Sequence, residues 1–469
     1  MARLFTEDEV RELVAKAVAE AVAPLLARIA ELEAEVARLK KHSGNSSKPP
    51  SSDIVKPPGP DGAEGRGRRR GKRAIGGQPG HAKHERKRFG PEEVDRIVEY
   101  ELPTEEARGL RPLARWHVVQ QVELVQRPFV VTEYRARRYR DPRTGGIVIA
   151  PLPPEVAKAG LVGPRLSAAI AFQKAACHMS YTTIQSFWRD LAGLDLSRGQ
   201  LAKVVRKVSA AIRTPYEELR AALAEQDRLG IDESGHKNAG RLHWTWCFRA
   251  PRFTVFHIDP SRGSEVLRAV LGETFGGVIG CDYFSAYRKY MADGGATVQF
   301  CMAHLIRDVR FLAEQANKSV ARWGEQLLDW LRKLFHALHR KDQWTPTKFA
   351  RRMEAARRGF LDRMRHPPSW SEARTLASRF RGRQADHYFA FLTRPGVEPT
   401  NNLTEQAIRH VVIDRRVTQG TRSDDGMRWC ERAWSVLATC AQQGRRAFHF
   451  FHDTLFAHLT AQPTPSLLP

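Results

Sequence analysis

Apolar residues near the amino terminus recur at alternating steps of four and three. The positions are Val18, Val22, Leu25, Ile29, Leu32, Val36 and Leu39. This spacing is the a/d seam of a coiled coil, and it predicts a dimerising helix over residues 1–41. Because Pro24 interrupts the pattern and only about three heptads are present, a single amphipathic helix packed on its own domain is the alternative.

The heptad pattern stops after Lys41. Residues 42–90 replace it with Pro, Gly, Ser and Arg, and we expect a linker because this composition cannot bury a core. Within it, the basic run GRGRRRGKR either neutralises phosphates, with release of counterions, or is a solvated tail.

Two further patterns follow along the chain. Residues 91–155 alternate apolar and polar positions in runs such as HVVQQVELV and FVVTEYRARRYR, which predicts strands of a small β-rich module. Residues 160–222 are helical in pattern, and SYTTIQSFWRDLAGLDLSRGQLAKVVRKVSAAI predicts a helix, a glycine turn and a second helix capped by Ser197. This pair resembles a helix-turn-helix with Arg198 and Lys203 as DNA contacts, while ordinary helical packing is the alternative.

A series of strand candidates begins at DRLGIDESG, which carries Asp232 to a strand end. LHWTWCF and FTVFHID follow as strands, then a helical stretch from Ser264 to Leu271, and then GGVIGCD, a buried strand that ends in Asp282. This order predicts a ribonuclease-H-like topology, in which the first and fourth strands are neighbours and the two aspartates meet. The alternative is that both aspartates only end strands or cap turns.

Paired carboxylates suit phosphodiester chemistry. Two divalent ions, about 3.5–4 Å apart, activate the attacking oxygen and stabilise the leaving one, and Mg²⁺ and Mn²⁺ prefer carboxylate oxygens. A third ligand is predicted at Glu405, in the first turn of a helix over 402–412, with Arg409 one turn later on the same face. Glu398 on the preceding loop is a rival, and a role for Glu405 that serves only the helix dipole is the alternative.

Charge makes nucleic acid the leading class of partner, although ribosomal proteins and membrane-surface proteins share such a charge. The chain has 76 Lys and Arg against 52 Asp and Glu, a net charge of +24, and this field attracts polyanions, nucleic acid first among them. No apolar run approaches the roughly 18 residues of a membrane span, a secretory signal pattern is absent from the first residues, and six cysteines without a CxxC pair fit a reduced compartment. We therefore expect a cytoplasmic, nucleoid-associated protein without membrane contact.

With these motifs identified, the chain resembles transposases of the insertion-sequence sixty-six family along nearly its whole length. The motifs in the family's order are the coiled coil, NSSKPPSSD from Asn45, GGQPGH from Gly76, IDESG from Ile231, CDYFSAY from Cys281, CMAHLIRD from Cys301, EPTNNLTEQAIR from Glu398, GTRSDDG from Gly420 and SVLATCAQQG from Ser435. The resemblance implies a multidomain α/β (α+β) protein whose DDE domain binds Mg²⁺ or Mn²⁺, two ions, through Asp232, Asp282 and Glu405. Such enzymes hydrolyse a strand at each element end, and the freed 3′-hydroxyl attacks target DNA.

The resemblance also implies how the carboxyl-terminal half is organised. The catalytic domain would span residues 226–445, with a helical insertion at about 309–390, and residues 446–469 would be a tail. Just before the insertion, Cys301 and His304 share a helix face and are expected to support the site structurally, because two ligands alone do not hold zinc. The basic residues after Glu405 are either phosphate contacts or solvated surface residues; they are Arg415, Arg416 and Arg422.

The sequence departs from the family in one module. Family members usually carry two CxxC pairs there, whereas this chain has no cysteine before Cys177 and places Asp141 and Thr144 in likely ligand positions. Residues 91–155 are therefore interpreted as a degenerate zinc-finger-like module, and zinc is not expected. The implied partners are the element's terminal inverted repeats, target DNA, a second copy of the chain and accessory proteins of the same element. A non-catalytic DNA-binding protein and a nuclease that cuts without joining are the alternatives.

Overall fold

The computed structural model describes residues 88–468, apart from 107, 109, 110, 112, 115, 123, 126 and 127, together with 15, 16, 18, 20–25 and 28. The chain divides into two compact units, one formed by Met1–Val55 with Tyr134–Pro469 and one by Lys56–Glu133. Among the described residues, no helix combines the length and the apolar character needed to cross a membrane.

The described residues of the predicted coiled coil are helical. Three seam positions belong to this part, and all of them are exposed: Val18, Val22 and Leu25. The remaining seam positions, from Ile29 onward, and linker residues 42–87 lie outside the described residues. Dimerisation through this helix therefore stays a prediction.

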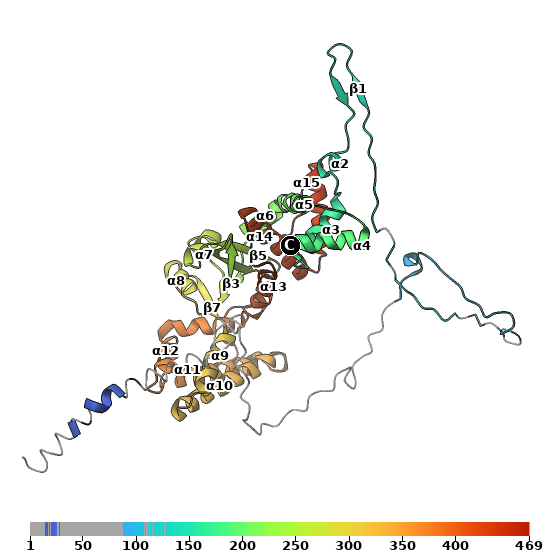
Figure 1. The fold of residues 1–469 in the computed structure, drawn as a ribbon. Coiled ribbons are helices and arrows are strands. Elements are labelled where there is room, and N and C mark those ends of the chain that lie inside the picture. The colour runs from blue at the N-terminus through green and yellow to red at the C-terminus, as the bar shows by residue number, and fades with distance from the viewer. Residues whose placement is uncertain are drawn as a thin grey trace, which may run out of the picture. The chain divides into compact units, whose positions relative to one another are not determined.

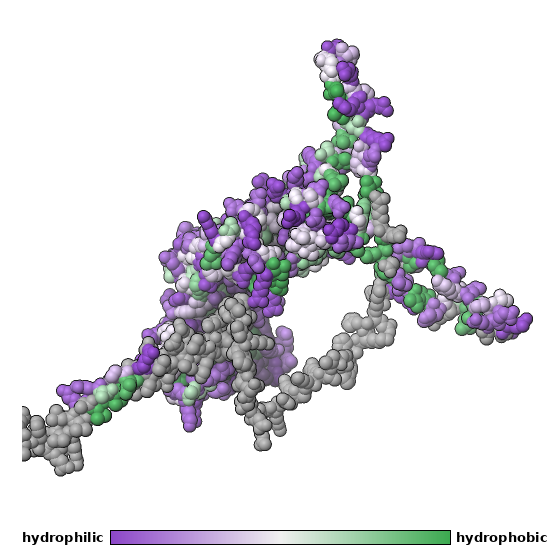
Figure 2. All heavy atoms as spheres, in the orientation of Figure 1, coloured by the Kyte–Doolittle hydropathy of each residue, from purple (hydrophilic) through white to green (hydrophobic). Residues whose placement is uncertain are grey.

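The expected β-rich module contains less strand than the pattern predicts. In the described part of the unit Lys56–Glu133 the only regular element is the short helix η2 (Pro91–Glu93), so the strand prediction for 117–125 is wrong for the described residues of that run. In the other unit, β1 (Arg138–Arg140) pairs antiparallel with β2 (Ile147–Ile149). An alternating pattern makes a strand only where another strand or a core covers the apolar face, and the apolar side chains of this hairpin are more than half exposed; apolar residues in green are visible along the arm that carries it (Figure 2).

The turn of this hairpin is held by Asp141 and Thr144, the two residues expected from the resemblance to stand in ligand positions. Thr144 Oγ1 donates to Asp141 Oδ2 at 3.0 Å, and the Arg143 N–H donates to Asp141 Oδ1 at 2.9 Å. Gly145 takes a positive φ of 69°, which glycine adopts without steric cost. Hydrogen bonds from Arg143 and Thr144 to the Asp141 carboxylate therefore help to hold this turn.

A helical region follows the hairpin. Its helices are α2 (Pro154–Ala159), α3 (Pro164–Ala175), α4 (Tyr181–Ala192), α5 (Arg198–Ala211) and α6 (Arg213–Ala221). The last helix of the chain, α15 (Ala447–Thr460), packs against α2, α3 and α5, as Figure 1 shows in dark red beside green. Residues 446–469, predicted as a tail, are thus largely a structural helix that buries Phe450, Phe451 and Leu455.

The predicted pair of helices with a glycine turn is present as α4 and α5. Gly193 ends α4 in the left-handed conformation, with φ 63°. Ser197 caps α5 in a capping box, because its Oγ accepts the Gln200 N–H at 3.2 Å while Gln200 Oε1 accepts the Ser197 N–H at 2.8 Å. Recognition of DNA by this pair stays a prediction.

A five-stranded sheet forms the centre of the carboxyl-terminal half. Its strands are β3 (Arg228–Asn238), β4 (Arg241–Arg249), β5 (Thr254–Asp259), β6 (Val278–Cys281) and β7 (Thr297–Phe300), in the spatial order β5-β4-β3-β6-β7. The first three strands are antiparallel, and β6 and β7 run parallel to β3. Helix α7 (Ser264–Leu271) leads from β5 to β6, and α8 (Ser285–Gly294) leads from β6 to β7. The predicted neighbourhood of the first and fourth strands is confirmed.

Helix α14 (Asp424–Gln443) covers the free edge of β5 with hydrogen bonds. Glu431 Oε1, Ser435 Oγ and Thr439 Oγ1 accept the N–H groups of Ile258, Phe256 and Thr254 at 2.7, 2.8 and 3.1 Å. The spacing matches, because four helix residues rise about 6 Å and two strand residues about 6.6 Å. The side chains of α14, among them Ser435 and Thr439 of the SVLATCAQQ motif, thus accept the N–H groups of the β5 edge. An edge strand without such partners is open to pairing with another strand.

A series of helices separates β7 from helix α13 (Asn402–Thr418), which packs on the sheet. It comprises α9 (Met302–Ala313), α10 (Lys318–His339), η3 (Lys341–Gln343), α11 (Pro346–Met364), α12 (Ser371–Ser378), η4 (Gly382–Tyr388) and η5 (Ala390–Leu392). The predicted helical character of 309–390 is confirmed, and its first helix begins earlier, at Met302. Helix α13 (Asn402–Thr418) then packs on β3 and β4.

Candidate active site

The register of the parallel strands brings Asp232 and Asp282 together. Gly230 of β3 pairs with Gly280 of β6, and two residues further along each chain stand the two aspartates. Asp282 directly follows β6, as predicted, but Asp232 lies within β3, which continues to Asn238. The prediction of a strand end at Asp232 was wrong because β4 pairs with β3 from Gly230 to Asn238, whereas the ladder to β6 stops at Gly230.

The pKa values of both aspartates are raised, so their surroundings disfavour the ionised carboxylates. Burial, followed by the carboxylates of Glu233, Asp282 and Glu405, raises the pKa of Asp232 well above its ordinary value. Burial and the Glu233 carboxylate raise the pKa of Asp282 to about 6. One N–H group opposes the rise in each case, since Glu233 donates to Asp232 Oδ1 and Phe284 to Asp282 Oδ1, both at 2.9 Å. The site therefore concentrates negative charge that a cation would stabilise.

Glu233 is a further acidic residue at the site, and the sequence analysis did not predict it. Its carboxylate, only 2% exposed, is paired with Arg262, whose Nε and Nη2 donate to Oε1 at 3.0 and 2.8 Å, and it accepts a hydrogen bond from Tyr287. The Arg262 guanidinium in turn lies over the rings of Trp244 and Phe284. The IDESG motif shows that Glu233 follows Asp232, but the sequence does not show that Arg262, 29 residues away, is its partner.

Helix α13 holds Glu405 against the strand that carries Asp232. Its cap residue Asn401 donates from Nδ2 to the Ile231 carbonyl at 2.8 Å, and the Glu405 N–H donates to the Asn401 carbonyl at 3.0 Å. Gly230 makes this approach possible, because a side chain there would collide with Thr404 Oγ1. The predicted third carboxylate therefore acts on the same cluster as the two aspartates.

The rival Glu398 has a different environment. It lines a cavity with Arg228 and Arg249, whereas Glu405 is the residue of the two that raises the pKa values of Asp232 and Asp282. The structure thus favours Glu405 in the carboxylate cluster.

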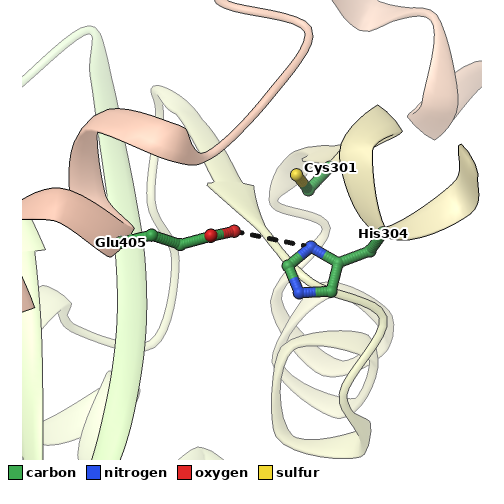
Figure 3. A group of neighbouring side chains, drawn as sticks. All are labelled: Cys301, His304 and Glu405. Atoms are coloured by element: carbon green, nitrogen blue, oxygen red, sulfur yellow. Dashed lines mark ion pairs between the residues drawn. The ribbon is translucent and has the colours of Figure 1, made fainter. Parts of the chain in front are cut away.

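Cys301 and His304, predicted as structural neighbours of the site, face Glu405 directly (Figure 3). Glu405 Oε1 lies 3.6 Å from His304 Nδ1, and Oε2 lies 3.6 Å from Arg307 Nη2. Burial lowers the pKa of His304, against the raising effect of Glu405. Cys301 Sγ accepts the Asn401 N–H at 3.2 Å, so α9 and α13 are joined at this point.

Comparison with known proteins identifies the family. A family model described as Transposase IS66 family matches residues 159–429, more than half of the 469 residues. The chain belongs to this family. A second model, of a family of unknown function (DUF6444), matches residues 2–87. The chain is also similar to uncharacterized protein y4qI of Sinorhizobium fredii, with 24% identity over 418 residues, which cover 82% of this chain and 76% of that protein.

Membership of the IS66 transposases implies DNA binding, and most of the predicted DNA contacts are accessible. The exposed residues are Arg198 and Lys203 on α5, Arg409 and Arg416 on α13, and Arg422 just after it. Their contact with DNA stays a prediction.

Two basic residues of this IS66 transposase are engaged within the chain instead. Arg415 donates from Nη1 to Ser234 Oγ at 3.1 Å and to the Gly235 carbonyl, which fastens α13 to β3. Lys207, on the second helix of the predicted helix-turn-helix, donates from Nζ to the last carbonyl groups of α2 at 2.7 and 2.8 Å. Both side chains therefore have structural partners that the sequence did not reveal.

Proposed function

We propose that this chain is the DNA transposase of a bacterial insertion sequence, with Asp232, Asp282 and Glu405 as its catalytic carboxylates. The observation that carries the proposal is the β3–β6 register, which sets the two aspartates side by side while α13 delivers Glu405 to them. The strand order β5-β4-β3-β6-β7 with parallel β6 and β7 is the order of a ribonuclease-H-like core, and we assign this fold to residues 226–445.

The donor set fits divalent metal ions. Each aspartate uses Oδ1 for a backbone hydrogen bond, which leaves Oδ2 for a ligand, and hard carboxylate oxygens are what Mg²⁺ and Mn²⁺ prefer. Of the neighbouring cations, Arg262 is paired with Glu233, whereas Arg307 lies 3.6 Å from Glu405 Oε2 and would share that carboxylate with a bound metal ion. Two ions bound here would activate the attacking oxygen and stabilise the leaving oxygen of a phosphodiester.

The residues of the chain contribute position and charge. The two aspartates are held by strand pairing, which fixes their spacing more tightly than loops would. Glu405 is held by Asn401 and by the contact of α13 with Gly230. Exposed arginines on α13 provide cations for the phosphates that flank the scissile bond. This arrangement suits both hydrolysis at an element end and attack by its 3′-hydroxyl on target DNA.

The partners follow from this proposal. They are the terminal inverted repeats of the element, the target DNA, a second copy of the chain bound through the helix of residues 1–41, and accessory proteins of the same element. The site of action is then the nucleoid in the cytoplasm. The basic field of +24 supports association with DNA, because neutralised phosphates release counterions.

A strand-transfer assay tests the proposal. Purified protein is incubated with a labelled DNA end of its own element, target DNA, any accessory proteins of that element, and Mg²⁺ or Mn²⁺. We expect joined product from the wild type and its loss in Asp232→Asn, Asp282→Asn and Glu405→Gln, with DNA binding retained, because each change removes metal-binding charge but little volume. Asp342→Asn is the matched control, since Asp342 is exposed in the insertion.

Each outcome has a distinct meaning. Cleavage without joining would identify a nuclease, and binding without cleavage under these conditions would identify a non-catalytic DNA-binding protein. Full activity in any one of the three carboxylate variants would remove that residue from the site.

A further inference from the structure

The cluster of Cys301, His304 and Glu405 has the geometry of a metal site. Cys301 Sγ, one ring nitrogen of His304 and one Glu405 oxygen all lie within 4.8 Å of one another. Tetrahedral zinc, with bonds of about 2.0–2.3 Å, holds its ligand atoms about 3.3–3.8 Å apart. The 3.6 Å between His304 Nδ1 and Glu405 Oε1 falls in this range, and the 4.8 Å limit for the whole set exceeds it by about 1 Å.

The facing atoms of His304 and Glu405 are not satisfied by the protein. Both His304 Nδ1 and Glu405 Oε1 are buried and have no hydrogen-bond partner among the described residues, and 3.6 Å is too long for a hydrogen bond between them. Buried polar atoms are almost always bonded. A ligand between the two atoms would bond both of them.

Three backbone N–H groups lie close enough to the sulfur of Cys301 to favour its thiolate, although burial raises the pKa of the thiol. It accepts the Asn401 N–H, and the backbone N–H groups of Ala303 and His304, at the first turn of α9, counter the rise in its pKa that burial causes. Outer hydrogen bonds of this kind orient metal-bound thiolates and tune them, and a helix amino terminus stabilises the anion.

We propose that Cys301 Sγ, His304 Nδ1 and Glu405 Oε1 bind one zinc ion, at a site that shares Glu405 with the Mg²⁺ or Mn²⁺ site assigned above to Asp232, Asp282 and Glu405. A thiolate and an imidazole select zinc and similar ions over magnesium. Binding transfers the Cys301 thiol proton to solvent as the sulfur–metal bond forms. Three protein ligands leave one tetrahedral position open.

The zinc ion would fix the carboxylate of Glu405. It would tie α13 to the start of α9 through Oε1 and leave Oε2, which lies 3.6 Å from Arg307 Nη2, outside the zinc site. The sequence showed only two of these ligands, three positions apart, and zinc was therefore not expected; the third ligand comes from a helix that begins after the whole insertion.

Cobalt binding tests this inference in the full-length protein. Protein freed of metal with a chelator is titrated with Co²⁺, whose bond to a thiolate gives a charge-transfer absorption in the near ultraviolet. We expect one equivalent of Co²⁺ with this band, displacement by Zn²⁺ but not by excess Mg²⁺, and about one zinc per chain by elemental analysis of protein purified without chelator. The band should vanish in Cys301→Ser and persist in Cys177→Ser, the matched control with an exposed thiol.

A second pair of variants keeps the test decisive if Cys301→Ser fails to fold. His304→Ala and Glu405→Gln retain the thiol, and each should weaken Co²⁺ binding at least tenfold. Absence of the band in the wild type, or its loss in Cys177→Ser instead of Cys301→Ser, would overturn the inference. The outcome is independent of the proposed activity, because the spectrum reports binding in the absence of DNA: a band without strand transfer refutes the transposase chemistry and keeps the zinc site, and strand transfer without a band does the reverse.

Discussion

Gly230→Ala is a sensitive probe of how α13 is seated on the sheet. A methyl group at this position would collide with Thr404 Oγ1 and stand 2.9 Å from Asn401 Oδ1. Neither neighbour can rotate away freely, because Thr404 is 2% exposed and Asn401 6%. The first turn of α13, which carries Glu405, must therefore move away from β3.

The size of the effect follows from these contacts. Overpacking a well-packed site costs about 1–3 kcal/mol, and weakening the hydrogen bond from Asn401 to the Ile231 carbonyl adds about 1 kcal/mol. At roughly 2–4 °C per kcal/mol for a domain of this size, we expect Tm to fall by about 5–10 °C. A displacement of about 1 Å at Glu405 would lower the strand-transfer rate on the order of 100-fold.

Thermal unfolding and strand transfer measure both effects beside a matched control. Gly235→Ala lies on the same strand, but its added carbon would meet Arg415 Nη1 at 3.5 Å and Leu242 Cδ1 at 4.0 Å, which is ordinary contact. Adding Thr404→Ala to Gly230→Ala should restore part of the lost stability. If Gly230→Ala matches Gly235→Ala in both Tm and rate, the proposed seating of α13 is incorrect.

Three further predictions concern charge. In metal-free protein the pKa of Asp282 is raised to about 6 from 3.8, so its protonation favours the native state at low pH and this contribution is lost as the pH rises. Between about pH 4 and 7 the free energy of unfolding of the wild type, measured in urea, should fall by up to about 3 kcal/mol relative to Asp282→Asn. Parallel pH profiles of the two proteins would contradict this prediction. Glu431→Ala should lower the free energy of unfolding by about 3 kcal/mol in urea, because it leaves the Ile258 N–H and nearby cations without their buried acceptor. A loss below about 1 kcal/mol would show that water takes the place of the Glu431 carboxylate. Arg416→Ala should weaken DNA binding and reduce the salt dependence of binding by about one counterion, while Tm stays unchanged. Arg415→Ala removes the hydrogen bonds to β3 and should lower Tm. Similar behaviour of the two variants in both measurements would count against these roles.

Local patterns predicted most of the elements correctly. The Gly193 turn and the Ser197 cap required only neighbours within a few residues, and the helical composition of the insertion is visible from residue type. The alternation at 117–125 was misleading in the described residues because no second strand covers it. A periodicity states which side chains can share a face, but a strand also requires a partner.

The carboxylates were predictable as candidates because each has a local signature, a strand terminus or the first turn of a helix. The two aspartates could even be paired from the order of elements. The pairing of Glu233 with Arg262 was not predictable, because the two residues are distant in sequence. The hydrogen bonds from Arg415 to Ser234 and Gly235 were not predictable for the same reason. Their charges looked the same as those of solvated residues.

The sequence by itself determined the types of most elements, the basic charge and the family. Only the tertiary structure decided that α14 side chains satisfy the β5 edge, that residues 446–469 contribute a packed helix, and that Cys301 and His304 face Glu405. The physical reason is range. Helix periodicity, caps and turns depend on residues within about one turn of one another. The carboxylate cluster and the buried ion pairs instead join residues that meet only after the sheet has fixed its register and α13 has docked on it.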